Sequence, residues 1–394
     1  MGKMVGLNGN YAIAYAVKAV GPDVIAAYPI TPQTAIVEKL AEFVAQGELD
    51  AEYIHVESEH SAMSAIVGAA ATGARVFTAT SSQGLGLMYE ILFIASSLRL
   101  PAVMGLVTRA YSAPINIWCD HGDFMSAADT GWIQYMSTSN QEAYDAIIMA
   151  YRVSEDPRVL LPAMVSIDGF IQSHTVEPVK LEDDEEVRKF VPRRPREIRL
   201  DPDKPMTLGA LGDPNWYYEF KMQQQVAMEE SRRVFDEVAS EFAKKFGRSY
   251  GAIDTFMTED AEAIIVTMGS TAGTFRVAVE KIRKEGAKVG LITIKLYRPF
   301  PRDDIVKILS NAKVVGIAER DLFFGAAYPG YLFNDVATSL YLANVRTKLA
   351  GFIFGLGGRA LRFSEAYEIT KKVWSFAKGE AEIPKKPIFV GVRE

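Results

Sequence analysis

The stretch Asp23-Val-Ile-Ala-Ala-Tyr-Pro-Ile-Thr-Pro-Gln-Thr34 decides the fold, because an apolar strand runs directly into two prolines. Pro29 and Pro32 fix φ, lack backbone donors and push the residues before them away from helical geometry. We therefore expect a strand, a rigid extended turn and then a helix. In an open α/β sheet, the turn after a strand's carboxyl end is where ligands bind. The alternative is a plain strand-to-helix connection in which Thr31 caps the helix.

Outward from this stretch, strand-like and helical patterns alternate along the chain. Segments such as 101–107 are apolar almost throughout, which is typical of parallel strands covered on both faces. The alternation breaks over 175–258, where prolines and an acidic run precede a long charged amphipathic helix, and then resumes. The sequence predicts an α/β fold with two doubly wound parallel-sheet domains, 1–174 and 259–394, joined by the helical linker 175–258.

Composition limits the class of protein. The 394 residues are 49% hydrophobic and 23% charged, which is enough for two or three domains with buried cores. A net charge of −6 argues against a nucleic-acid partner. The N-terminus lacks the apolar segment of a signal peptide, and no apolar run reaches the roughly 18 residues of a membrane-spanning helix. We expect a cytoplasmic protein that binds neither nucleic acid nor membrane.

Cysteine and histidine usage limits the possible metal chemistry. The single cysteine, Cys119, excludes an internal disulfide and a Cys-x-x-Cys metal or iron–sulfur site made by this chain alone. The four histidines have no metal-ligand spacing, so we expect no metal site of the chain's own. If the function requires electron transfer, other chains must hold the clusters.

Glu59 is the first candidate for chemistry. It follows the short strand-like segment 53–56 and stands where the next helix begins. The unpaired amides and the dipole of a helix N-terminus favour a carboxylate, so a structural cap is one reading. Glu57 and His60 crowd the same turn, however, and a partly desolvated carboxyl group there has a raised pKa, as a proton-sharing acid requires. Both readings stay open from these residues alone.

Arg109 is the second candidate, because it directly follows an apolar strand. If the strands are parallel, its guanidinium reaches the same sheet edge as Thr31. An arginine together with a hydroxyl group is a good receptor for a small carboxylate. The alternative is a surface salt bridge, which is the commoner role of an arginine but a less natural one after a buried strand.

Further motifs are distributed along nearly the whole chain. They are Tyr28-Pro-Ile-Thr-Pro32, Glu57-Ser-Glu-His-Ser61, Thr78-Ala-Thr-Ser-Ser-Gln-Gly84, Arg109 with Ser112-Ala-Pro114, Asp129-Thr-Gly-Trp-Ile-Gln134, Tyr297-Arg-Pro-Phe-Pro301 and Gly355-Leu-Gly-Gly-Arg359. In these motifs the chain resembles the α subunit of the 2-oxoacid:ferredoxin oxidoreductases, and the pyruvate and 2-ketoisovalerate enzymes are the nearest relatives.

The resemblance implies a thiamine diphosphate enzyme of anaerobic metabolism that converts a 2-oxoacid and coenzyme A to acyl-CoA, carbon dioxide and two electrons. Glu59 would bond the pyrimidine N1′ of thiamine and so promote removal of the C2 proton. Thr31 and Arg109 would hold the carbonyl and carboxylate of the oxoacid. The family match places further contacts beside these: the substrate at Tyr28, and the cofactor at Pro29, Ile30 and Gln83.

The resemblance also implies a division of labour between subunits. The sequence lacks the Gly-Asp-Gly pattern, followed at a distance by Asn, with which thiamine enzymes hold Mg²⁺ and diphosphate. Domain 1–174 would bind the pyrimidine, and domain 259–394 would resemble the C-terminal domain of transketolase. A β subunit would supply the diphosphate side and an iron–sulfur cluster, and ferredoxin-like γ and δ subunits would complete a hetero-oligomer.

One departure from the family pattern concerns substrate choice. Ala127 and Ala128 stand where the family usually has Gln-Arg. The loss of two long polar side chains would leave room or apolar surface near the site, which admits a branched or aryl 2-oxoacid such as phenylglyoxylate beside pyruvate. The alternative is a loop change that is compensated elsewhere.

Two other functions compete with this one. A non-catalytic scaffold would account for the missing diphosphate motif, but not for Thr31, Glu59 and Arg109 all falling at strand ends. A component of a transketolase-type thiamine enzyme would share the two-domain plan but would normally keep the diphosphate motif in the same chain. The identity of the 2-oxoacid, the final electron acceptor, the stoichiometry and the residues that bind coenzyme A are not determined by the sequence.

Overall fold

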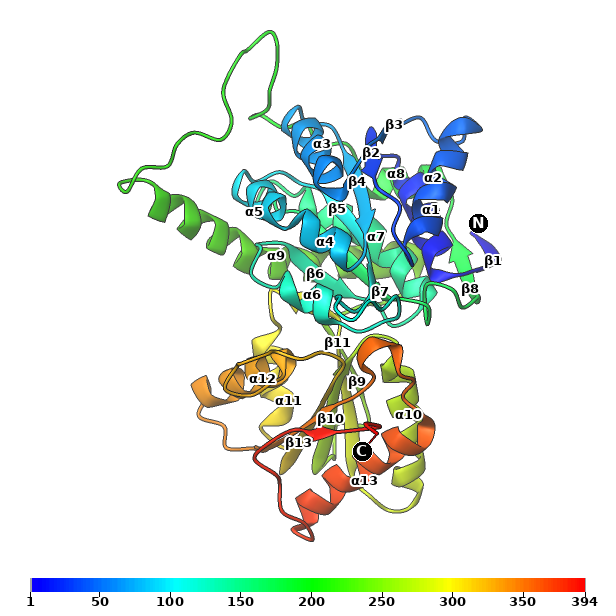
Figure 1. The fold of residues 1–394 in the computed structure, drawn as a ribbon, viewed down its shortest axis with the longest axis vertical. Helices are drawn as coiled ribbons and strands as arrows, with labels where there is room; N and C mark the ends of the chain where they lie inside the picture. The colour runs from blue at the N-terminus through cyan, green and yellow to red at the C-terminus, as the bar shows by residue number, and fades with distance from the viewer. Residues whose placement is uncertain (1, 394) are drawn as a thin grey trace.

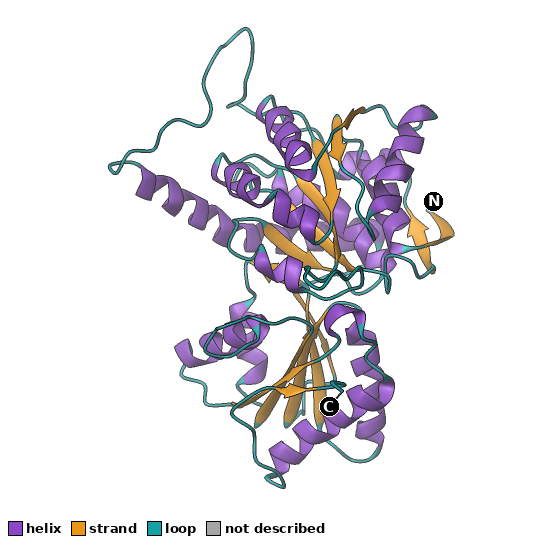
Figure 2. Cartoon of the chain, in the orientation of Figure 1, coloured by secondary structure: helices purple, strands orange, loops and turns teal. Residues whose placement is uncertain are grey.

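The computed structural model describes residues 2–393 and consists of two α/β lobes, each with a central sheet between layers of helices (Figures 1 and 2). The upper lobe in Figure 1 contains a seven-stranded sheet and the lower lobe a six-stranded one. The fold class predicted from the sequence, α/β with parallel sheets in two domains, is confirmed. Within the described residues, no helix combines the length and apolarity needed to cross a membrane.

The seven-stranded sheet has the order β12-β6-β7-β5-β4-β2-β3 and is parallel except for β12, which pairs antiparallel with β6. Its strands are β2 (Val24–Ala27), β3 (Glu52–His55), β4 (Val76–Thr80), β5 (Val103–Thr108), β6 (Ile133–Met136), β7 (Ala163–Asp168) and β12 (Leu296–Arg298). Every residue of β4, β5 and β7 is buried, as expected for parallel strands covered on both faces.

The helices of this lobe cover both faces of the sheet. They are α1 (Gly9–Val20), α2 (Thr34–Ala45), α3 (Glu59–Ala71), α4 (Gln83–Leu87), α5 (Tyr89–Ser97), α6 (Gly122–Ser126), α7 (Asn140–Ser154) and α8 (Asp184–Phe190). One hydrophobic cluster joins α1, α2 and α7 to the sheet, and another joins α3 and α5. The segment after β4 forms two helices, α4 and α5, which meet at Met88.

The six-stranded sheet has the order β15-β14-β13-β10-β11-β9 and is parallel except for β9. Its strands are β9 (Ile253–Phe256), β10 (Ala263–Met268), β11 (Val289–Ile294), β13 (Val314–Glu319), β14 (Lys348–Ile353) and β15 (Ile388–Phe389). Helices α10 (Thr271–Lys284) and α13 (Phe363–Lys378) cover one face and α11 (Arg302–Leu309) and α12 (Tyr331–Leu342) the other (Figure 1), and Leu356–Gly358 is a short 3₁₀ turn.

Two strand pairs cross the boundaries expected from the sequence. β8 (Glu177–Leu181), which lies in the predicted linker, pairs antiparallel with β1 (Lys3–Leu7) in the first lobe. β12, from the second half of the chain, extends the first sheet. Neither pairing follows from local periodicity, because both join residues far apart in sequence. The division into 1–174, 175–258 and 259–394 stays a prediction.

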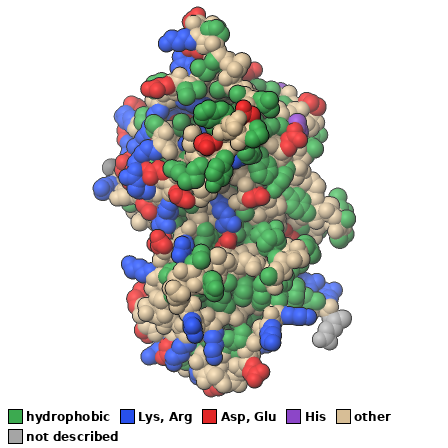
Figure 3. Space-filling model, turned by 90° about the vertical axis from the view of Figure 1, so that its left-hand side faces the viewer, with side chains coloured by type: hydrophobic (Ala, Val, Ile, Leu, Met, Phe, Trp, Pro, Cys, Tyr) green, Lys and Arg blue, Asp and Glu red, His purple; other side chains and the backbone are tan. Residues whose placement is uncertain are grey.

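The linker contains α9 (Tyr217–Phe246), which ends at Gly247 in the left-handed conformation. The C-terminal part of α9 buries Val234, Val238 and Phe242 in the core that it shares with α7. The N-terminal part projects from the first lobe together with the loop before it (Figure 1). Large apolar side chains are exposed there, among them Trp216, Tyr218 and Phe220, and hydrophobic groups gather on this side of the molecule in Figure 3.

A buried polar cluster joins the two lobes. Asp168, at the end of β7, accepts hydrogen bonds from the backbone N–H and the hydroxyl of Ser270, just before α10. His121 Nε2 lies 2.8 Å from the Asp168 carboxylate, and the Arg320 guanidinium lies 3.7 Å from it. Burial alone would lower the pKa of His121, but its attraction and hydrogen bond to Asp168 outweigh burial and raise this pKa to about 10. His121 is therefore a cation at neutral pH.

The charge on His121 should make the stability of the chain depend on alkaline pH. Because its pKa is raised on folding from 6.5 to about 10, its contribution is fully present below pH 6.5 and is lost as the pH rises through about 10. We expect the Tm of the wild type to fall more between pH 7 and pH 10 than the Tm of His121→Gln, measured by scanning calorimetry. Equal slopes would contradict this assignment.

Candidate functional site

Glu59 is the first residue of α3 and lies at the carboxyl edge of the first sheet. The helix cap is Ser58, whose side chain accepts the Ser61 N–H, so the reading of Glu59 as the cap is wrong. Glu59 is 7% exposed, and no other residue within 2–393 forms a hydrogen bond or an ion pair with its carboxyl group, which interacts only with its own backbone N–H. Burial raises its pKa, while its own backbone N–H acts in the opposite direction. A buried, unpaired carboxyl group costs stability unless a ligand satisfies it.

The close approach of Gly84 to Glu59 leaves no space for a larger residue at position 84. A Cβ atom at Gly84 would lie 2.7 Å from Glu59 Oε1 and 2.4 Å from Thr80 Oγ1. The hydroxyls of Thr80 and Ser81 are buried and, within the described chain, have no partner. A carboxyl group and two free hydroxyls beside a glycine are a suitable set for a polar heterocycle, so these residues fit the pyrimidine of thiamine.

The Pro-Ile-Thr-Pro turn is held in place by two buried amides. Gln33 donates to the carbonyl of Ala79 at 2.8 Å and accepts the Ile30 N–H at 3.2 Å. Asn10 donates to the carbonyl of Pro32 at 2.9 Å. Helix α2 begins only at Thr34, with Gln33 before it, so the alternative that Thr31 caps the helix is wrong.

The hydrogen bonds of Gln33 and Asn10 fix the position of this turn relative to the neighbouring loops of the sheet. Thr31 is exposed, as are Tyr28 and Pro29, while Ile30 is half-buried. Gln83, in the next loop of the sheet, has its Oε1 2.8 Å from the hydroxyl of Ser82.

Arg109 follows β5 and reaches the same edge. Its Nη1 donates to the carbonyl of Thr31 at 2.9 Å, and its Nε donates to the carbonyl of Asn116 at 2.8 Å. The predicted proximity of Thr31 and Arg109 is therefore present in the fold. No carboxylate of the described chain forms an ion pair with Arg109, so the salt-bridge alternative is not what the structure contains. Burial lowers the pKa of Arg109, and nearby Asp123 opposes this shift.

Three residues at this edge were not singled out from the sequence. Gln33 and Gly84 stand in quoted motifs, but the contacts that make them important involve residues far along the chain. Asp123 lies in α6 and is fully buried. A buried carboxyl group between two loops of the sheet edge is a signal that only the tertiary structure supplies.

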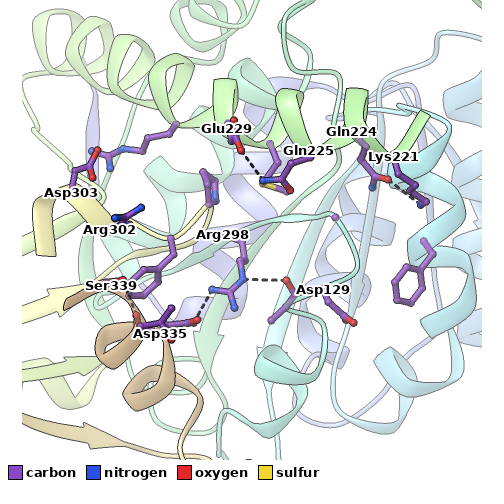
Figure 4. A pocket seen from close by; sticks show the side chains of 18 of the residues that line it. Asp129, Lys221, Gln224, Gln225, Glu229, Arg298, Arg302, Asp303, Asp335 and Ser339 are labelled. Carbon is purple, nitrogen blue, oxygen red and sulfur yellow. Dashed lines mark hydrogen bonds and ion pairs between the residues drawn. The ribbon is translucent and has the colours of Figure 1, made fainter. Parts of the chain in front are cut away.

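Ala127 and Ala128 lie elsewhere. Ala127 is fully buried in the hydrophobic cluster that both lobes share. Ala128 lines a cavity of about 1080 Å³ between α9 and the two lobes, and Arg298 in that cavity contacts Ala128 and pairs with Asp335 at 3.0 Å (Figure 4). Arg109 does not line this cavity. The influence of these alanines on substrate choice stays a prediction.

One cluster in the described chain has the ligand types of a metal site. Single ligand atoms of Cys119, His121 and Asp168 lie within 4.8 Å of one another. His121 and Asp168 already pair with each other, and the Arg320 guanidinium beside them would repel a dication. The expectation that this chain has no metal site of its own stays a prediction.

Comparison with known protein families covers most of the chain. Residues 15–240 match the model described as pyruvate flavodoxin/ferredoxin oxidoreductase, thiamine diphosphate-binding, and residues 261–366 match pyruvate:ferredoxin oxidoreductase core domain II. Pyruvate synthase subunit PorA of Pyrococcus horikoshii is 50% identical over 98% of both chains. PorA of Thermotoga maritima is 47% identical over 99% of this chain and 98% of its own length. Ketoisovalerate oxidoreductase subunit VorA of Pyrococcus horikoshii is 45% identical over 96% of both chains.

Solved structures share the fold at low identity. The 2-oxoglutarate:ferredoxin oxidoreductase from Magnetococcus marinus, with 2-oxoglutarate, coenzyme A and succinyl-CoA bound, superposes with a TM-score of 0.74 at 18% identity. The match covers 94% of this chain and 65% of that one. A split-gene transketolase, an inactive β4 tetramer, has a TM-score of 0.56 at 12% identity and matches over 94% of this chain and 99% of its own. At these identities, the two structures bear on the fold alone.

Proposed function

Since the chain belongs to the family of 2-oxoacid:ferredoxin oxidoreductase α subunits, we propose that it supplies the pyrimidine half of a thiamine diphosphate site and the receptor for the substrate carboxylate. The reaction is the oxidative decarboxylation of a 2-oxoacid with coenzyme A to acyl-CoA, carbon dioxide and two electrons. The observation that supports this most directly is Glu59, whose buried carboxyl group has no partner in the described chain and a pKa raised by burial.

Glu59 acts on the cofactor. When bound, thiamine diphosphate supplies the nucleophilic carbon that adds to the oxoacid carbonyl. Glu59 holds a proton at the pyrimidine N1′, a role for which a raised pKa is suitable. Gly84 allows this close approach, because any side chain there would displace Glu59. Pro29, Ile30 and Gln83 contribute the remaining walls of the cofactor site.

Arg109 binds the substrate. Two of its N–H groups are used by the carbonyls of Thr31 and Asn116, which fix the plane of the guanidinium. The donors that remain are free to bind the oxoacid carboxylate with charge-assisted hydrogen bonds. The exposed Thr31 hydroxyl binds the oxoacid carbonyl, and Tyr28 lies at the entrance.

The substrate and the assembly follow from relatives rather than from contacts in this chain. Relatives named for pyruvate and for ketoisovalerate are similar to it, at 50% and 45% identity. We therefore take the substrate to be pyruvate or a bulkier branched-chain or aryl 2-oxoacid. A β subunit supplies Mg²⁺, the diphosphate contacts and an iron–sulfur cluster, and ferredoxin-like γ and δ subunits carry electrons onward in the cytoplasm.

A non-catalytic scaffold explains the site less well. A docking protein gains nothing from a buried carboxyl group without a partner, which costs stability, whereas a pyrimidine nitrogen would satisfy Glu59. The surrounding free hydroxyls of Thr80 and Ser81 add to this cost.

The proposed division of the cofactor site predicts the behaviour of the chain by itself. Because the diphosphate group and Mg²⁺ contribute most of the charge of thiamine diphosphate, we expect the isolated chain to bind it at least 100-fold more weakly than the assembled complex does, a difference of about 2.7 kcal/mol. Titration calorimetry in the presence of Mg²⁺ measures both affinities. Tight, Mg²⁺-dependent binding to the isolated chain would contradict the proposal.

A further inference from the structure

Asp123 joins two loops of the site that act on different partners. It is fully buried in the short helix α6. Its Oδ2 accepts the backbone N–H of Ser82 at 2.9 Å and that of Arg109 at 3.0 Å, while Oδ1 accepts the N–H of Phe124 at 2.8 Å. One carboxyl group therefore holds the loop after β4 and the loop after β5 at a fixed separation.

The loop after β4 needs this support. Ser82 has φ of 47° and ψ of −117°, in a region that a residue with a side chain rarely adopts. The strained residue lies two positions before Gly84, whose backbone packs on the Glu59 carboxyl group. Ser82 also donates its hydroxyl to the carbonyl of Ala110 at 2.7 Å, which is a second bond between the two loops. A shift of the Ser82 backbone would therefore move the surface against which Glu59 is held.

We propose that Asp123 is a positioning residue. It fixes the distance between the loop that packs behind Glu59 and the loop that carries the substrate-binding Arg109. The inference rests on the proposed function, in which Glu59 acts on the cofactor and Arg109 on the substrate. Reacting groups must be aligned closely, since a misplacement of about 1 Å can cost roughly 10²-fold in rate. Asp123 Oδ2 binds the backbone N–H groups of Ser82 and Arg109. The distance between the two loops therefore does not depend on the flexible ends of their side chains.

A carboxyl group suits this position better than an amide. An ionised carboxylate offers only acceptors, so it can take three N–H groups without presenting a donor to any of them. An asparagine would direct its NH₂ group either at the Phe124 N–H or at the N–H pair of Ser82 and Arg109. Burial, helped by the nearby Asp120 carboxylate, raises the pKa of Asp123 to about 7 even though the N–H groups of Ser82, Arg109 and Phe124 favour the charged form. The ionised form that accepts all three N–H groups therefore predominates above this pH.

The test is Asp123→Asn in the complex assembled with its partner subunits. We expect KM for the 2-oxoacid to rise about 10-fold through Arg109 and the affinity for thiamine diphosphate to fall about 10-fold through the Ser82 loop, each factor of ten corresponding to about 1.4 kcal/mol. In an Arg109→Ala background the effect of Asp123→Asn on KM should vanish, while its effect on the cofactor persists. A merely structural role would not separate the two constants in this way.

The matched control is Asp156→Asn, which also removes charge from a buried carboxyl group. Asp156 binds Arg158 and Arg194 and touches neither loop of the site. Asp156→Asn should lower Tm and leave both KM for the 2-oxoacid and the affinity for thiamine diphosphate unchanged. Asp123→Asn with wild-type constants, or with an effect on KM that persists in Arg109→Ala, would overturn the inference. A wild-type complex without 2-oxoacid oxidation would instead contradict the proposed function.

A second variant covers a failure of Asp123→Asn to assemble. Ser82→Ala keeps the N–H that Asp123 accepts and removes the hydroxyl, which lies 2.7 Å from the carbonyl of Ala110 and 2.8 Å from Gln83 Oε1. It should shift the same two constants in the same direction, by about 3-fold, which corresponds to the roughly 0.6 kcal/mol of a weak hydrogen bond. If Ser82→Ala assembles with wild-type constants, a change in the Ser82 loop reaches neither the cofactor nor the substrate, and the inference is overturned.

Discussion

Glu59→Gln is expected to abolish most of the activity of the assembled enzyme while leaving the fold intact. Glutamine fills the same volume beside Gly84 but cannot hold or release the proton at the pyrimidine N1′. General acid–base catalysis usually contributes roughly 10²–10⁴-fold, so we expect kcat to fall by that factor. The measurements are the rate of 2-oxoacid oxidation and the rate at which the C2 proton of bound thiamine exchanges with solvent.

The chain offers a control two residues away. Glu57 is exposed, lies two residues before α3 and accepts a hydrogen bond from the hydroxyl of Ser61, so Glu57→Gln should keep wild-type kcat and proton exchange. Glu59→Gln should also have a slightly higher Tm than the wild type, because burying a carboxyl group that no other residue binds lowers the free energy of unfolding. If Glu59→Gln oxidises the 2-oxoacid and exchanges the C2 proton at wild-type rates, Glu59 has no catalytic role.

Arg109→Ala is expected to weaken every 2-oxoacid by a similar factor. In the proposed role the guanidinium binds the carboxylate that all these substrates share, and a charge-assisted hydrogen bond contributes about 1.5–3 kcal/mol, or roughly 10–150-fold in kcat/KM. Comparing pyruvate, 2-ketoisovalerate and phenylglyoxylate in wild type and variant tests this. Arg109→Lys keeps the charge but loses the two bonds that fix the guanidinium plane, so it should recover only part of the loss.

A result confined to one substrate would contradict this role for Arg109 and would place it near the substrate's side chain instead. The distinction matters because the sequence suggests Ala127 and Ala128 for selection of the substrate's side chain. Ala127 lies in the hydrophobic core, and Ala128 lines a cavity that Arg109 does not line. A fully buried Ala127 also has no room for a glutamine, so a replacement there acts first on the core.

Much of the site follows from the sequence because the signals are local. Apolar runs mark the strands, and residues directly after them must lie at the carboxyl edge of a parallel sheet. This reasoning places Thr31, Glu59 and Arg109 at one edge, where the structure also has them. The two prolines act on their own neighbours and so define the turn before α2 without information from elsewhere in the chain.

The tertiary structure alone decides which of these loops touch. The contacts of Gly84 with Glu59, of Asp123 with Ser82 and Arg109, and of Asp168 with Ser270 join residues that are 14 to 102 positions apart. Periodicity and propensity describe one segment at a time, whereas these contacts depend on strand order and on how the loops pack after the sheet has formed. The sequence alone therefore determined the fold class and the residues at the sheet edge, and the packed fold determined that Glu59 stays unpaired while Asp123 holds its neighbours.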